Sequence, residues 1–164
     1  MSSIDRDVMY VQNPALGAAL LWRFVCGHYS NNNRPVQFPV LFIVLPIIFR
    51  QDLCGVIKTT QKRSGLSKLS EKLFKSKEND SIHFVNNMAF QMRELTLEAF
   101  SIAIETNLLS VITEDATVFP VVTAMPNPSS YLQCKDMLSC ADKLGIWCSD
   151  LTLLEISKWL KVRF

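Results

Sequence analysis

Glycine and histidine are scarce in this sequence of 164 residues, and their scarcity excludes two common kinds of active site. The five glycines stand singly, so neither G-x-x-x-x-G-K-[ST] nor G-x-G-x-x-G occurs and there is no recognisable phosphate-binding loop. The two histidines, His28 and His83, have no nearby carboxylate or cysteine at the spacing of metal ligands. We therefore expect no ATP site, no zinc site and no Cys/His nucleophile.

Cysteine occurs, but in no pattern that points to chemistry. The five cysteines are odd in number, form no C-x-x-C pair and mostly lie inside apolar segments. The spacing of the last three matches none of the recurring zinc-ligand patterns. We expect reduced, buried thiols of a cytosolic protein at Cys26, Cys54, Cys134, Cys140 and Cys148.

A secretory signal and a long apolar run are also lacking. The first ten residues, MSSIDRDVMY, contain two acidic residues, one basic residue and no apolar run. The apolar run FPVLFIVLPIIF (38–49) is shorter than the ~20 residues that a membrane-spanning helix needs, and Pro46 interrupts it. We expect a cytoplasmic protein without membrane association, in which this run is a core segment, either helical or extended.

Net charge is low, because 17 basic and 15 acidic residues leave a formal charge of +2. The chain as a whole is therefore not a polycation that coats nucleic acid or anionic lipid. Basic residues do concentrate between positions 58 and 77, where Glu71 is the only acidic residue. This basic strip predicts either auxiliary, salt-sensitive contact with double-stranded DNA or a merely solvated lysine face. The candidate DNA contacts are Lys58, Lys62, Arg63, Lys68, Lys72 and Lys75.

What the sequence does contain is a very apolar segment near its start, NPALGAALLWRFVCGHY (13–29). Asn13 is a good helix N-cap, and Pro14 suits the first helical turn, where a missing N–H costs nothing. Apolar side chains then fill nearly every side, and Arg23 is the only charged residue before Gly27. Such a helix must be buried nearly all round, so either the domain folds around it or a partner covers one side.

The middle of the chain predicts further helices and one hairpin. Short helical patterns on either side of TTQKRSG (59–65) have helix-turn-helix-like spacing. Asp80 or Ser81 then caps a long helix that reaches about Asn107. Segment 108–122, with a turn at 114–116, predicts a short β-hairpin that resembles a wing. The apolar stripe of the long helix comprises Val85, Met88, Met92, Leu95, Ala99 and Ile102.

Two helices are expected at the C-terminal end. One ends near Gly145-Ile146-Trp147, and the other begins at a capping box formed by Thr152 and Glu155. Without an internal repeat or a linker, 1–164 is expected to be a single domain. It would comprise an N-terminal arm (1–12), a helical core with the helix-turn-helix-like segment and hairpin (13–122), and a C-terminal helical pair (123–164). The predicted fold class is mainly α with a short β-hairpin, a winged-helix-like helical domain.

Several segments, in order along essentially the whole chain, carry a family resemblance. They are NPALGAALLWRFVCGHY (13–29), FPVLFIVLPIIFR (38–50), NLLSV (107–111), LGIWCS (144–149) and TLLEISKWLKVRF (152–164). In these segments the sequence resembles the middle component of bacterial three-component ABC systems. That family overlaps the small subunit of Lamassu-type anti-phage defence complexes. This sequence departs from the Gly-Val-Arg-Pro-like turn that often closes the family, keeping only Val162 and Arg163.

The resemblance implies a non-enzymatic adaptor, without cofactor, that joins an SMC-like ABC ATPase to an effector, frequently a nuclease, encoded in the same operon. In an anti-phage or anti-plasmid complex, it would help couple the sensing of foreign DNA to effector activation. The apolar first helix suits an obligate subunit, because contiguous exposed apolar surface marks an interface. The candidate protein contacts are Asn13, Leu16, Leu20, Trp22, Phe24, Trp159, Leu160 and Phe164.

A second functional class also fits the pattern, a stand-alone winged-helix DNA-binding regulator. It would dimerise through the apolar stripe of the long helix and bind duplex DNA by itself in a salt-dependent manner. Charge reversal at Lys62, Arg63 and Lys68 would then abolish binding. In an adaptor, the same change would weaken DNA contact only within the assembled complex.

Overall fold

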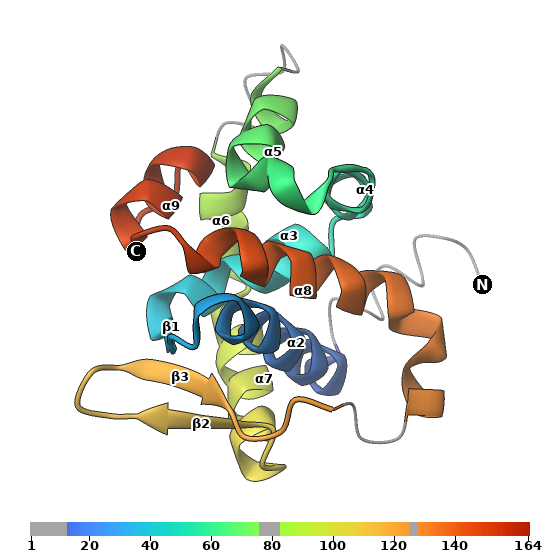
Figure 1. Ribbon diagram of the computed structural model, residues 1–164, viewed down its shortest axis with the longest axis vertical. Coiled ribbons are helices and arrows are strands. Elements are labelled where there is room, and N and C mark those ends of the chain that lie inside the picture. The colour runs from blue at the N-terminus through green and yellow to red at the C-terminus, as the bar shows by residue number, and fades with distance from the viewer. Residues whose placement is uncertain (1–12, 76–82, 125–127) are drawn as a thin grey trace.

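A computed structural model describes residues 13–75, 83–124 and 128–164, and these are arranged around the first helix (Figure 1). Helix α2 (Pro14–Asn32) starts after Asn13, whose Oδ1 accepts a hydrogen bond from the Leu16 N–H at 3.1 Å. It ends at Asn33, which has a left-handed backbone with φ of 56°. The predicted N-cap at Asn13 is therefore confirmed.

Helix α8 (Lys135–Ser149) crosses α2 so closely that two backbones meet at glycines. A β-carbon on Gly145 would lie 2.1 Å from the carbonyl oxygen of Phe24, and one on Gly27 would lie 2.2 Å from that of Asp142. Neither glycine ends a helix; each leaves room for the other backbone. Helix α8 ends at Ser149, two residues beyond the predicted end at Gly145-Ile146-Trp147, and Gly145 itself is required by tertiary packing rather than by helix termination.

The predicted long helix is two helices, α6 (Phe84–Gln91) and α7 (Arg93–Glu105), which meet at Met92. Helix α6 packs on the apolar segment around residues 38–48, and α7 packs mainly on α2. Val85, Met92 and Ala99 are buried, which confirms the stripe as a core face. Dimerisation through this stripe is thereby contradicted. The predicted caps at positions 80 and 81 lie outside the described residues.

The apolar run 38–49, for which the sequence left the type open, is helical. It forms a 3₁₀ helix, η1 (Phe38–Ile43), followed by α3 (Val44–Ile48), and its side chains lie largely in the core. Helix α4 (Gln51–Thr59) follows. No single helix of the described residues has the length and apolarity to cross a membrane. The segments Phe38–Ile48 and Gln51–Thr59 have the required length and apolarity only when they are taken together, and the two are bent by 101° relative to each other.

The strands form a small antiparallel sheet with the order β1-β3-β2. Strands β2 (Leu109–Ile112) and β3 (Thr117–Pro120) are the predicted hairpin, joined by a turn at 113–116. Strand β1 (Val36–Gln37) pairs with β3 and was not predicted, because two residues are too short to carry an alternating pattern. The mainly α fold with a short hairpin is confirmed.

The helix-turn-helix-like segment comprises α4, the 3₁₀ turn η2 (Lys62–Ser64) and α5 (Gly65–Phe74). It lies at the opposite end of the molecule from the hairpin, with α2 and α8 between them (Figure 1). The hairpin therefore is not a wing beside α5, and the winged-helix-like arrangement is wrong. Helices α6 and α7 lie between α5 and the hairpin in the sequence, and the chain passes along them from the end of the molecule that contains α5 to the end that contains the hairpin.

The C-terminal end contains the 3₁₀ helix η4 (Pro128–Cys134), helix α8 and helix α9 (Leu153–Leu160). The capping box is present: the Thr152 N–H donates to Glu155 Oε2 at 2.7 Å, and the Glu155 N–H donates to Thr152 Oγ1 at 3.2 Å. Helix α9 packs against α5 and ends at Lys161, where a left-handed backbone with φ of 52° turns the chain.

Candidate protein-docking surface

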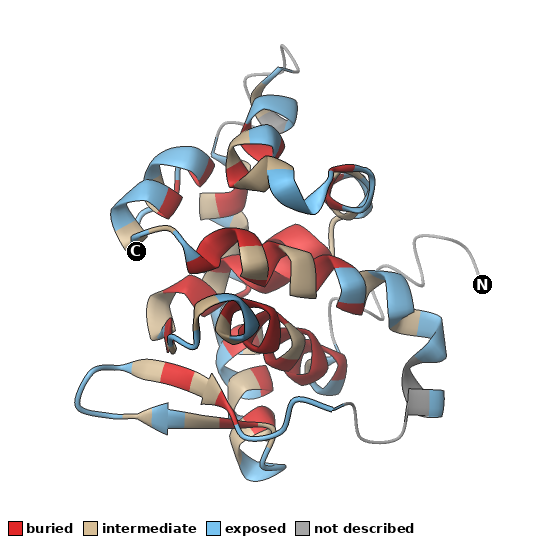
Figure 2. Ribbon diagram, viewed as in Figure 1, coloured by how far each residue is buried: buried red, intermediate tan, exposed pale blue. Residues whose placement is uncertain are grey.

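The apolar side chains of α2 are covered by this chain itself (Figure 2). Leu20 and Phe24 are fully buried, and Trp22 and Leu16 are 1% and 7% exposed. Helices α8 and α7 and strand β3 pack around the helix, and Trp22 Nε1 donates to the Val122 carbonyl at 2.7 Å. The prediction that Leu16, Leu20, Trp22 and Phe24 contact a partner is therefore wrong.

The other predicted contact residues have different environments. Leu160 is fully buried, so its prediction as a partner contact is also wrong, because α9 packs this side chain against its own domain. Asn13 is exposed at the start of α2, where its side chain serves as the N-cap. Trp159 is 40% exposed and Phe164 is 45% exposed, so these two side chains remain accessible.

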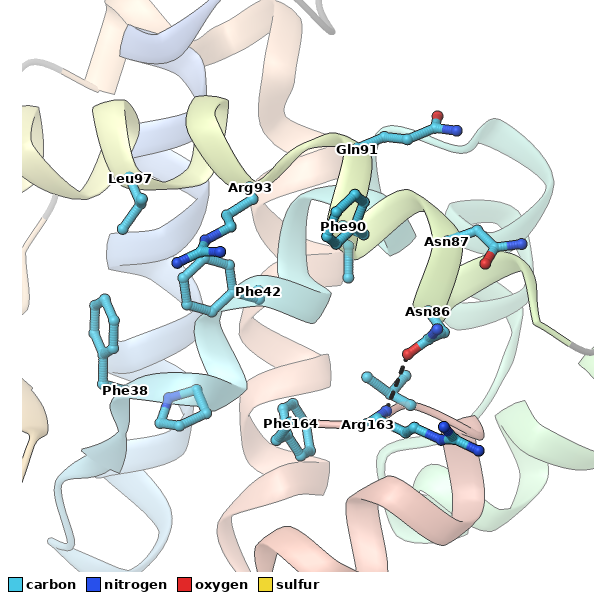
Figure 3. Close-up of a pocket in the computed structure, with 13 residues that line it drawn as sticks. Phe38, Phe42, Asn86, Asn87, Phe90, Gln91, Arg93, Leu97, Arg163 and Phe164 are labelled. Carbon is cyan, nitrogen blue, oxygen red and sulfur yellow. Dashed lines mark hydrogen bonds between the residues drawn. The ribbon is translucent and has the colours of Figure 1, made fainter.

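An apolar groove of about 750 Å³ runs between η1, α6, the start of α7 and the last residues of the chain (Figure 3). Three apolar residues that line it are conspicuously accessible: Phe90 is 79% exposed, Phe164 is 45% exposed and Leu97 is 37% exposed. The polar lining consists of amide side chains and arginines. The aromatic residues of the lining are Phe38, Phe42, Phe90 and Phe164.

One wall of the groove is held by contacts between aromatic rings. The Phe38 ring meets that of Phe42 edge-on with 5.5 Å between centroids, and it meets that of Phe100 at 5.1 Å. Edge-to-face contacts of this kind stabilise a defined ring orientation. Because Phe100 belongs to α7, they fix η1 against that helix and give the groove a preformed side.

The opposite wall is the C-terminal turn after α9. The Val162 side chain is 3% exposed, and its N–H donates to the Ser157 carbonyl at 3.2 Å. The Arg163 N–H donates to Asn86 Oδ1 at 3.0 Å, a bond drawn in Figure 3. These bonds attach the turn to both α9 and α6, and they place Phe164 along the groove.

Phe164 was a predicted contact residue, whereas Phe90, the most exposed large apolar residue of the described part of the chain, was not predicted. The available signal was local. Phe90 lies off the apolar stripe, on a stretch of helix that also carries Asn86, Asn87 and Gln91. An aromatic residue on an otherwise polar helix face is a candidate for a binding site rather than for the core.

The sequence matches a family model described as "ABC-three component (ABC-3C) system Middle Component 3" over residues 1–164. The chain belongs to this family. The resemblance to the middle component of three-component ABC systems is thus confirmed, and membership implies association with the other components of such a system. Searches of curated proteins and of solved structures each found no match.

The basic strip of this ABC-3C middle component is exposed on α4, η2 and α5. Lys58 and Lys68 are in surface ion pairs, with N···O distances of 2.7 and 3.1 Å, and Lys72 donates to a threonine hydroxyl at 3.0 Å. Surface pairs of this kind contribute little stability and exchange readily. DNA contact by the strip stays a prediction. The strip residues without such a partner among the described residues are Lys62, Arg63 and Lys75.

All five cysteines of this middle component are free thiols, and Cys26, Cys140 and Cys148 are buried as predicted, whereas Cys54 and Cys134 are only partly buried. Burial raises the pKa of Cys148 to about 12 and that of Cys26 to about 11. Cys54 differs, because a hydrogen bond from the Cys140 thiol lowers its pKa. Within residues 13–75, 83–124 and 128–164, no three His, Cys, Asp or Glu side chains form a group that could hold a metal ion.

Proposed function

We propose that this protein is a non-enzymatic adaptor that joins an SMC-like ABC ATPase to an effector in a bacterial anti-phage or anti-plasmid defence complex, of which Lamassu is one type. The observation that supports it is the exposed aromatic groove on a chain that belongs to a family of middle components. A middle component has to bind other chains, and accessible apolar surface on a folded domain is the usual means of binding them.

The contrast with the rest of the molecule strengthens the proposal. The large aliphatic side chains, Trp22 and Phe24 of α2 are buried inside the domain, so they are not free for a partner. Within the run 38–48, Phe38, Pro39 and Phe42 are partly buried and line the groove, whereas the other side chains lie in the core. Phe90 and Phe164 instead project along a groove whose walls are already fixed by aromatic contacts and hydrogen bonds. Aromatic anchors in a preformed site contribute strongly to affinity, because little ordering is needed on binding.

In this proposal the ATPase detects foreign DNA and the adaptor transmits that event to the effector, which is frequently a nuclease. The adaptor itself does no chemistry. The basic strip adds a salt-sensitive contact to DNA that the ATPase holds, chiefly through Lys62 and Arg63, which have no ion-pair partner among the described residues.

The test is to co-express this chain with the products of the adjacent genes, purify it by affinity and determine the mass of the assembly. We expect a complex that contains a coiled-coil ATPase and an effector. Phe90→Asp should remove the groove-bound component, whereas Leu132→Asp, at a residue that is 70% exposed on η4, should leave the complex intact. A protein that runs alone or as a dimer, and binds duplex DNA by itself, would overturn the proposal.

A further inference from the structure

The apolar groove continues into a second hollow of about 480 Å³ whose lining is cationic. The two hollows share Asn86, Val162 and Arg163, so they form one uninterrupted surface around the C-terminal turn. Lys158 and Lys161 also line the second hollow, beside His83. None of the described residues that line either hollow is acidic.

We propose that this continuous surface binds an acidic amphipathic segment of another component of the same system. Apolar side chains of that segment occupy the groove beside Phe90, and its carboxylates lie on Lys158, Lys161 and Arg163. The inference rests on the proposed adaptor function and adds the chemistry of the partner to it.

The arrangement of the cations supports a carboxylate at one end of the bound segment. Lys161 Nζ lies 4.3 Å from the centroid of the Phe74 ring, so the ring holds this ammonium group in place. Arg163 lies at the junction of the two hollows, and its backbone N–H is bonded to Asn86. A guanidinium at this junction can pair with a carboxylate through two parallel hydrogen bonds.

The lining suits a polypeptide. Beside its phenylalanines the groove has the smaller apolar residues Pro39, Ala89 and Leu97, so it offers a mixed apolar surface on which the side chains of a peptide can pack. The lysines gather in the second hollow, where the carboxylates of the segment lie. The amide side chains of Asn87 and Gln91 at the groove can donate to, and accept from, a peptide backbone.

The first experiment uses the complex purified from co-expression with the adjacent genes. A photo-reactive benzoylphenylalanine replaces Gln91, which is exposed and lines the groove, and mass spectrometry maps the cross-linked peptide. We expect a segment of another component in which Asp or Glu residues follow apolar ones. The same group at Leu132 is the control and should not capture that segment.

The second experiment measures the affinity of the purified groove-bound component for variants of this chain. Lys158→Glu combined with Arg163→Glu should weaken binding at least tenfold and reduce its dependence on salt. Arg163→Lys keeps the charge but cannot form the two parallel hydrogen bonds, so its effect should be intermediate between the wild type and the charge reversal. Lys135→Glu reverses an exposed charge at the start of α8 and should have no effect. Circular dichroism verifies that each variant is folded.

The outcomes separate this inference from the adaptor function. If the complex assembles but Gln91 cross-links to DNA, to a second copy of this chain or to a basic segment, the inference is overturned and the adaptor stands. Loss of binding with Phe90→Asp but not with the charge reversals also overturns it, because the groove is then used without carboxylates. If no complex assembles at all, the proposed function fails.

Discussion

Helices α2 and α6 use apolar residues in opposite ways. Helix α2 has apolar side chains on nearly every side, and its leucines, Trp22 and Phe24 are buried, whereas α6 carries Phe90, which is 79% exposed beside the amide side chains of Asn86, Asn87 and Gln91. The way in which apolar residues are distributed around a helix thus reports how completely its own domain surrounds it. An isolated aromatic residue on a polar face reports a surface that is free for a partner.

The physical reason is the cost of exposure. A helix like α2 would leave a large contiguous apolar patch in water whenever a partner dissociated, and such patches cause aggregation. One exposed phenylalanine costs far less, because folded proteins routinely carry apolar atoms on their surface. The two helices therefore predict different responses to mutation.

The largest expected effect comes from breaking the enclosure of α2. Gly145→Ala places a β-carbon against the Phe24 carbonyl oxygen, so α2 and α8 must separate, at a cost of about 3 kcal/mol of stability. Chemical denaturation with a circular dichroism readout measures the loss. Gly55→Ala is the matched control, because a β-carbon there meets no atom within 4 Å in exposed helix α4. A normal stability for Gly145→Ala would contradict the close crossing.

The direct comparison is between one buried and one exposed side chain. Leu20→Ala should reduce the free energy of unfolding by about 2–5 kcal/mol, because Leu20 is fully buried in the core. Phe90→Ala should change it by no more than about 0.5 kcal/mol, since the side chain contacts mostly water. Urea unfolding of both variants measures these two losses. A larger loss for Phe90→Ala than for Leu20→Ala would refute the conclusion that Leu20 is a core residue and Phe90 a surface residue.

A smaller effect is expected at the start of α9, which carries the C-terminal wall of the groove. Thr152→Ala removes one half of the capping box and should cost about 1 kcal/mol of stability. Hydrogen exchange should show the loss as faster exchange at the first turn of α9, where the Glu155 N–H loses its acceptor. Unchanged protection there would show that the box does not stabilise the helix.

The smallest expected effect is on the pH dependence of stability, and it tests whether His28, near the C-terminal end of α2, is buried. His28 is 7% exposed, and burial lowers its pKa from the ordinary 6.5. As pH falls below 6.5, the unfolded chain binds a proton at His28 more readily than the folded chain does, so stability is full above that pH and falls below it. Unfolding at about pH 7.5 and about pH 5.5 measures this slope. His28→Gln should flatten it, and an unchanged slope would assign it to other groups.

Local signals predicted some elements well. The N-cap at Asn13, the hairpin turn at 114–116 and the capping box of Thr152 and Glu155 all depend on residues within a few positions of one another. The free thiols and the apolar stripe of α6 and α7 were also predicted correctly. Such features are determined by backbone preferences and side-chain periodicity, which the sequence contains in full.

The tertiary structure determined which segments that are distant in the sequence pack together. The residues near Gly145 in the sequence do not indicate that the Phe24 carbonyl lies against it. Glycine is necessary at this position because the backbones of α2 and α8 are in contact there. The break at Met92 and the distance between α5 and the hairpin likewise follow from packing.

The sequence by itself therefore determined where α2 and α9 begin, the position of the hairpin, and that α2 must be buried. Only the tertiary structure showed that the domain itself buries the large apolar side chains of α2 and that Phe90 and Phe164 share a groove. The physical reason is that hydrophobic burial is non-directional: it specifies that a surface leaves water and does not specify which surface covers it.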